Sequence, residues 1–137
     1  SEMCIRDRSD ETVGVLLYSD DIDTRKAVMD GVGLRPGKDS PKVEWSQAAT
    51  PAGALELMRT GHFAALVLDG EATKEGGMSL AKEISETFDD VPPVIILTAR
   101  QQDDWLAAWA GAAATIPDPL DPIVLQETLA AVLKGEL

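Results

Sequence analysis

Short apolar runs alternate with helix-like stretches along most of the chain, and this alternation restricts the possible fold more than any other feature. The expected strands are residues 13–18, 42–48, 63–68, 94–97 and 113–116. Between and after them, apolar residues recur three and four positions apart, which is typical of amphipathic helices. The expected helices are residues 22–32, 52–58, 80–88, 105–110 and 123–133. Because parallel strands need helix-length connections, the pattern predicts an α/β doubly wound domain with a parallel five-stranded sheet covered by helices on both faces.

Residues that start or end helices occur at the boundaries of these segments. The pairs Thr50-Pro51 and Asp121-Pro122 each place a capping side chain before a proline at the first helical position. A glycine follows several of the helical stretches, where a residue with positive φ commonly ends a helix. These glycines are Gly33, Gly61, Gly111 and Gly135.

The length of 137 residues predicts one domain, over residues 12–137, with no output domain. Residues 1–11 fit neither element type, and we expect them to be a tail or an artefact of sequence assembly. No apolar run approaches the roughly 20 residues that a transmembrane helix needs, and the N-terminus lacks a signal-peptide core. A single cysteine, Cys4, excludes an intramolecular disulfide. We therefore expect a cytoplasmic protein.

The net charge of −12 restricts the partners of this chain. Such a charge repels nucleic-acid phosphates and anionic lipid headgroups, and no basic patch with interleaved aromatic residues offsets it. We expect no nucleic-acid binding and no membrane insertion.

Three segments that end in polar residues carry a family resemblance. "FAALVLD" ends at Asp69, "PPVIILTA" contains Thr98, and "GAAATIPDPLDP" follows. Their order and spacing resemble the response-regulator receiver (CheY-like) family, over residues 12–134. The resemblance implies a flavodoxin-like (βα)5 sandwich with strand order 2-1-3-4-5 and a role in two-component phosphorelay signalling. It also implies an acidic pocket for Mg²⁺ and an aspartate that accepts a phosphoryl group from a histidine kinase.

Mapped residue by residue, the resemblance assigns Asp69 as the phospho-acceptor and Thr98 as the hydroxyl switch residue. Thr115 stands where the family has a switch aromatic. The acidic pocket would consist of Asp20, Asp69 and the backbone carbonyl of Glu71. A hard cation prefers such oxygen ligands. The family's acidic pair aligns with Ser19-Asp20, which keeps Arg25 in step with the family's basic helix residue; a shift of one residue gives Asp20-Asp21 instead.

Asp118 departs most from the family pattern, because Asp118-Pro119 stands where the family has lysine-proline. Two unit charges about 4 Å apart interact by roughly 4 kcal/mol at an effective dielectric constant near 20. Replacing lysine with aspartate turns this attraction to a phosphoryl oxygen into repulsion. Ser19 in place of an acid also weakens the metal site, so we expect at most weak Mg²⁺ binding and no other cofactor.

Trp109 is the candidate partner contact. The resemblance places it on the outer side of the fourth helix, and receivers commonly bind partners through the fourth helix, fifth strand and fifth helix. Tryptophan is enriched at binding hot spots. This face could serve a protein partner or a homodimer.

The sequence thus predicts an atypical receiver, similar to degenerate single-domain receivers of bacteria, that acts as a protein-interaction module with impaired or absent phosphorylation. One alternative is a slow but genuine phospho-acceptor at Asp69. Another is a domain that binds a divalent metal or small ligand in the same acidic pocket. We expect no conventional enzyme, because the sequence has neither a Gly-rich phosphate loop nor a histidine paired with a nucleophile. The only histidine, His62, is assigned no catalytic role.

Overall fold

The computed structural model describes residues 12–37, 40–70, 77–98, 112–117 and 120–134. The strands are β1 (Thr12–Tyr18), β2 (Lys42–Ala48), β3 (Ala65–Asp69), β4 (Val94–Thr98) and β5 (Ala114–Pro117). The helices are α1 (Ile22–Val32), α2 (Pro51–Thr60), α3 (Gly77–Thr87) and α5 (Pro122–Leu133). Several features expected from the sequence lie outside the described residues, among them the tail at 1–11, the helix at 105–110 with Trp109, and the positions of Glu71 and Asp118.

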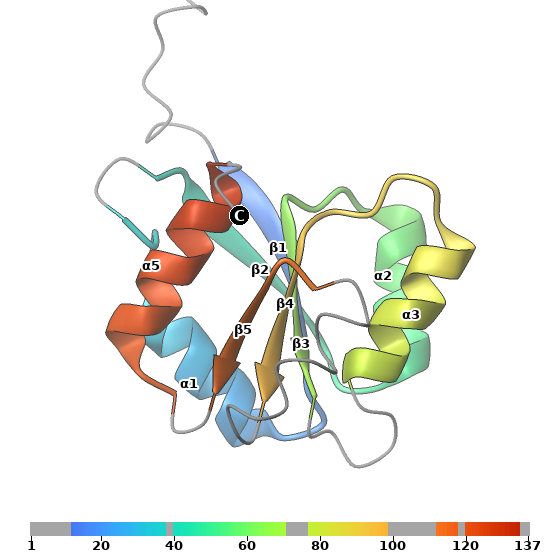
Figure 1. Ribbon diagram of the computed structural model, residues 1–137, viewed down its shortest axis with the longest axis horizontal. Coiled ribbons are helices and arrows are strands. Elements are labelled where there is room, and N and C mark those ends of the chain that lie inside the picture. Colours follow the sequence, from blue (N-terminus) through green and yellow to red (C-terminus); the bar gives the residue numbers. More distant parts are fainter. Residues whose placement is uncertain (1–11, 38–39, 71–76, 99–111, 118–119, 135–137) are drawn as a thin grey trace, which may run out of the picture.

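The five strands form one parallel sheet in the order β2-β1-β3-β4-β5, which confirms the predicted topology. Figure 1 shows α1 and α5 on one face of this sheet and α2 and α3 on the other. The order reverses direction at β1, since the chain first moves outward to β2 and then returns to add β3 on the other side. Ligands of open α/β sheets bind beside such a switch point, at the carboxyl ends of the strands.

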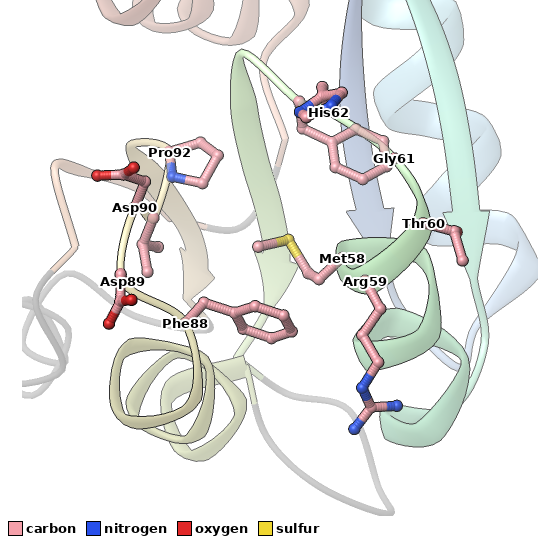
Figure 2. A pocket seen from close by; sticks show the side chains of 11 residues that line it. Met58, Arg59, Thr60, Gly61, His62, Phe88, Asp89, Asp90 and Pro92 are labelled. Carbon is pink, nitrogen blue, oxygen red and sulfur yellow. The ribbon is translucent and has the colours of Figure 1, made fainter.

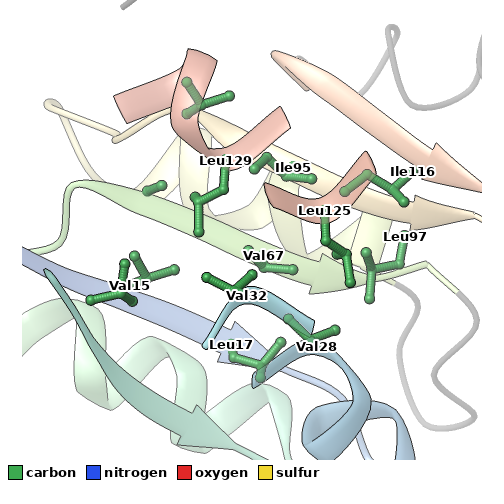
Figure 3. Close-up of a cluster of buried hydrophobic side chains, with 13 residues drawn as sticks. Val15, Leu17, Val28, Val32, Val67, Ile95, Leu97, Ile116, Leu125 and Leu129 are labelled. Atoms are coloured by element: carbon green, nitrogen blue, oxygen red, sulfur yellow. The ribbon is translucent and has the colours of Figure 1, made fainter. Parts of the chain in front are cut away.

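Two apolar clusters, one on each face, hold the helices to the sheet. Side chains alternate between the faces along every strand, so Leu16 and Leu66 join the cluster under α2 and α3, whereas Val15 and Val67 join the cluster under α1 and α5. Figure 3 shows the second cluster, in which Leu125 and Leu129 of α5 lie over the strands. Burial on both faces explains why β1, β3 and β4 are apolar runs, whereas the edge strand β2 is more polar and more exposed.

The predicted helix caps are largely confirmed. Thr50 accepts a hydrogen bond from the Gly53 amide at the start of α2, and Asp121 accepts one from the Ile123 amide at the start of α5. Gly33 ends α1 with a positive φ of 72°. The prediction of positive φ at Gly61 is wrong, because Gly61 adopts φ −123° and ψ 170°, so the chain leaves α2 in an extended conformation. Gly111 and Gly135 lie outside the described residues.

Within the part of the chain that the structure describes, the helices are all too short or too polar to span a bilayer.

Candidate functional site

Three polar residues meet at the carboxyl edge of the sheet. Ser19 follows β1, Asp69 is the last residue of β3, and Thr98 is the last residue of β4. The three strands are neighbours, and the parallel register pairs Tyr18 with Leu68 and Leu97 with Asp69. In Figure 1 this edge is the lower one, where the strand arrowheads end. The topology therefore brings together side chains that are about 30 to 80 residues apart in the sequence.

The Ser19 hydroxyl donates a hydrogen bond to Oδ2 of Asp69, with an oxygen-oxygen distance of 2.7 Å. Both residues are buried, at 0% and 7% exposure. The Ser19 Oγ also accepts a hydrogen bond from the Asp21 amide, at 3.1 Å. Because that amide supplies its own proton, the hydroxyl proton is directed to the carboxylate. The backbone amide of Ser19 donates to the Ala48 carbonyl, which ties the site to β2.

Thr98 carries an unpaired polar group. Its side chain is 2% exposed, and its Oγ1 has no hydrogen-bond partner in the part of the chain that the structure describes. A buried hydroxyl without a partner costs about 1–3 kcal/mol, so such a group in a native protein needs an explanation. Thr98 lies one residue beyond the position paired with Asp69. Its hydroxyl can donate to an oxygen-rich group that binds at this edge.

The two consecutive acids after Ser19 have different roles. Asp21 is the N-cap of α1, where its two carboxylate oxygens accept hydrogen bonds from the Asp23 amide and the Thr24 hydroxyl. Asp20 is half-buried between Ser19 and this cap. The alignment of the family's acidic pair with Ser19-Asp20, or with Asp20-Asp21, stays a prediction.

Thr115 and Arg25 lie on elements next to these residues. Thr115 is half-buried in β5 and is paired in register with Ile96 of β4. Arg25 is half-buried in the first turn of α1, and its Nε is fully buried with no hydrogen-bond partner among the described residues.

A metal ion would find an incomplete set of ligands among the described residues. Asp20 and Asp69 offer carboxylates, which suit Mg²⁺. However, Oδ2 of Asp69 already accepts the Ser19 hydroxyl, and the described residues contain no group of three or more histidine, cysteine, aspartate or glutamate side chains that could hold a metal ion. The expected third ligand, the carbonyl of Glu71, lies outside the described residues, as does Asp118.

A separate hollow lies at the opposite, amino edge of the sheet, and the sequence did not predict it. It has a volume of about 700 Å³ and is enclosed by the end of α2, the chain entering β3 and the chain entering β4. Figure 2 shows its side chains, among them Met58, Phe88 and Asp90. His62 lies exposed at its rim. The glycine, aromatic and proline residues around positions 61–63 and 88–92 resemble ordinary loops, so they give no signal of a cavity.

Comparisons with known proteins identify relatives that span nearly the whole chain. No protein-family model matches the chain. Two proteins of Mycobacterium tuberculosis, from strains CDC 1551 and H37Rv and each named an uncharacterized response regulatory protein, are 39% identical over 127 residues. These matches cover 93% of this chain and 96% of each relative.

Solved structures share the fold at lower identity. The receiver domain of the Francisella response regulator 1452 has a TM-score of 0.76 and 20% identity, over 91% of this chain and 99% of that one. A CheY-like response regulator receiver domain protein of Methanospirillum hungatei JF-1 has a TM-score of 0.71 and 21% identity, over 92% and 97% of the two chains.

Proposed function

The chain belongs to the response-regulator receiver family of two-component signalling, and we propose that it is an atypical member in which phosphorylation of Asp69 is impaired or absent. In this proposal it acts as a protein-interaction module. The observation that carries the proposal is the 2.7 Å hydrogen bond from Ser19 to Asp69.

This hydrogen bond bears on both steps that phosphorylation needs. Ser19 stands where the family resemblance expects an acid, so the pocket has one carboxylate fewer for a metal ion. The Ser19 hydroxyl also occupies an oxygen of Asp69 that a metal ion or phosphodonor would have to share. Hydrogen bonds to charged groups contribute about 1.5–3 kcal/mol. We therefore propose that any Mg²⁺ site formed by Asp20, Asp69 and the Glu71 carbonyl is weak; Mg²⁺, when bound, would neutralise phosphoryl charge.

Asp118 supports the same proposal through its charge. An aspartate at the position of the family's lysine cannot stabilise a phosphoryl oxygen, because its side chain carries a negative charge instead of a positive one. The same argument holds whatever the rotamer of Asp118, because an acidic side chain that points away from the pocket also leaves the phosphoryl group without a cation.

The proposed partner face comprises the helix expected at 105–110 with Trp109, together with β5 and α5. Among these elements, the first turn of α5 supports the proposal with two exposed apolar side chains, Ile123 at 62% and Val124 at 40%. Exposed apolar residues beside each other are typical of contact surfaces. A protein partner or a second copy of the chain would cover them.

A second function, slow but genuine phosphorylation of Asp69, is favoured by Thr98. Its buried hydroxyl has no hydrogen-bond partner among the described residues and lies one residue beyond the position paired with Asp69 in the sheet. It would gain an acceptor if a phosphoryl group were attached to Asp69. The third alternative, binding of a divalent metal or small ligand without phosphorylation, would use the same acidic pocket. We propose no conventional enzymatic activity in any of the three cases.

The test is the intact mass of the protein after incubation with acetyl phosphate and Mg²⁺. We expect little or no phosphate adduct on the wild type and none on Asp69→Ala. The double variant Ser19→Asp, Asp118→Lys restores both missing charges, and we expect it to acquire an adduct that depends on Asp69.

Two results would contradict the proposal. One is a wild-type protein that is readily phosphorylated on Asp69. The other is a folded double variant that gains no adduct while the wild type does. A calorimetric titration with Mg²⁺, Mn²⁺ and Ca²⁺ tests the metal-binding alternative. Heat of binding in the wild type that disappears in Asp20→Asn, in a protein that forms no phosphate adduct, would favour this alternative.

A further inference from the structure

The hollow at the amino edge, here called the amino-edge groove, has an apolar floor. Four partly buried apolar residues line it and also pack against the cluster under α2 and α3: Met58, Phe63, Phe88 and Val91. Figure 2 shows Met58 and Phe88 lying between the two walls of the groove. Their buried sides belong to the core, and their remaining surface faces the groove.

Phe63 is fixed in place by two glycines. A Cβ atom on Gly14 would lie 3.3 Å from the Phe63 ring, and one on Gly61 would lie 3.2 Å from it. The ring therefore fills the space that a side chain on either residue would take. Phe63 also lines a second, smaller hollow of about 350 Å³, which Gly14, Glu44 and Ser46 border on its far side. The floor is thus built by close packing.

The rim of the groove is acidic on one wall. Asp89 and Asp90 are both exposed there, and neither carboxylate forms a hydrogen bond or an ion pair with any residue that the structure describes. On the α2 wall, Arg59 is paired with Glu56 at 3.4 Å, which offsets its charge. The net charge of −12 adds a long-range field of the same sign as the two aspartates.

We propose that the amino-edge groove docks a basic segment of a partner protein in which apolar and cationic side chains alternate. Apolar side chains of the segment would lie on Met58 and Phe88, and its lysine or arginine side chains would pair with Asp89 and Asp90. The volume of about 700 Å³ is within the range of pockets that bind ligands. Because the acids stand on the exposed rim, an extended segment that continues past the groove can reach them.

This surface is distinct from the receiver site. The groove lies where β3 and β4 begin, whereas Ser19, Asp69 and Thr98 lie where strands end. The proposal therefore does not depend on whether Asp69 is phosphorylated, and failure of either proposal leaves the other unaffected.

The test titrates the ¹⁵N-labelled protein with a capped hexapeptide that alternates arginine and leucine, at low ionic strength. We expect amide chemical-shift changes to concentrate at Gly61, His62 and Asp90. The double variant Asp89→Asn, Asp90→Asn should weaken binding about five- to tenfold, since an exposed ion pair contributes up to about 1 kcal/mol. The matched control Glu83→Gln, Glu86→Gln removes the same charge from the exposed side of α3 and should change affinity less than twofold.

Several outcomes would overturn the proposal. Shift changes centred on Ser19 and Gly70 would mean that the peptide binds the acidic pocket instead. Equal binding of a peptide that alternates glutamine and leucine would remove the role of charge, and equal binding of one that alternates arginine and serine would remove the role of the apolar floor. Concentration-dependent shifts at the groove without peptide would indicate a second copy of this chain, and an absence of shifts would leave no docking site.

Discussion

The two edges of the same sheet handle polar and apolar groups in opposite ways. At the carboxyl edge, Ser19, Asp69 and Thr98 are polar and buried. At the amino edge, the charged groups of Asp89 and Asp90 are exposed, and apolar side chains such as Phe88 retain surface at a groove. Burying polar groups is costly unless they are hydrogen-bonded.

The physical cause is the direction of the chain at each edge. At the carboxyl edge the chain leaves buried strands, so the first polar residues after the apolar run are still covered by neighbouring elements. At the amino edge the chain enters the strands from helix ends and loops that already face water, as at Gly61 and Asp90. We therefore expect the carboxyl edge to bind only groups that fit its buried polar residues. The amino edge, whose residues face water, is expected to accept a wider range of partners.

The largest difference in stability between the two edges is expected when one methyl group is added at each of them. In Gly70→Ala the new Cβ would lie 2.7 Å from the Leu97 carbonyl oxygen, a backbone atom that cannot move freely. In Gly61→Ala the contacts are longer: the nearest atom, on the Phe63 ring, is 3.2 Å away, and the Leu57 carbonyl oxygen is 3.3 Å away. We expect Gly70→Ala to lower the free energy of unfolding by about 3 kcal/mol and Gly61→Ala by less than about 1 kcal/mol, measured by urea denaturation. Equal losses would mean that both edges are packed alike.

The next largest effect should come from Ser19→Ala. This change leaves Oδ2 of Asp69 without its hydroxyl donor and the Asp21 amide without its acceptor. We expect a loss of about 2 kcal/mol in the free energy of unfolding, because the acceptor stays buried. Ser85→Ala on the exposed side of α3 removes a hydroxyl bonded to the Lys82 carbonyl and serves as the control, with a change below about 0.5 kcal/mol. A neutral Ser19→Ala would show that this hydrogen bond does not hold the site together.

Thr98→Val should act in the opposite direction. Valine has nearly the same shape as threonine but lacks the hydroxyl, which is buried and has no hydrogen-bond partner among the residues that the structure describes. We expect the free energy of unfolding to rise by about 1 kcal/mol, as measured by the shift of the urea midpoint. A loss of stability would contradict the structure by showing that the hydroxyl is hydrogen-bonded in the folded protein.

The smallest effect is expected at the rim of the amino-edge groove. Arg59 and Glu56 form an exposed ion pair at 3.4 Å on the last turns of α2. We expect Arg59→Gln to change the free energy of unfolding by less than about 0.5 kcal/mol, since such pairs are screened by water. A larger loss of stability, measured by thermal unfolding, would show that this ion pair holds the wall of the groove more firmly than its exposure indicates.

Much of the fold follows from local patterns. The apolar runs located all five strands to within about two residues, and the capping roles of Thr50 and Asp121 could be recognised because capping depends on neighbours in the sequence. The error at Gly61 has the same origin. A glycine after a helix permits positive φ but does not require it, and here the packing of Phe63 against Gly61 accompanies an extended exit.

The candidate site could be predicted only in part. The positions of Asp69 and Thr98 at strand ends follow from the apolar runs that precede them. The sequence showed Ser19 only as a replacement for an acid of the family pattern. Nothing in the sequence indicates that its hydroxyl donates to a residue 50 positions away. The groove was not expected at all, because its floor and rim come from two separate segments, residues 58–63 and 88–92.

The sequence by itself thus determined the order of the elements, the parallel sheet and the edge at which its polar residues gather. These properties arise from side-chain periodicity, which acts over a few neighbouring residues. Only the tertiary structure decided which polar atoms meet, as Ser19 and Asp69 do, and which find no partner within the described part of the chain, as in Thr98. Hydrogen bonds form only within a few tenths of an ångström of their optimal length, and that distance is set by sheet register and packing rather than by local pattern.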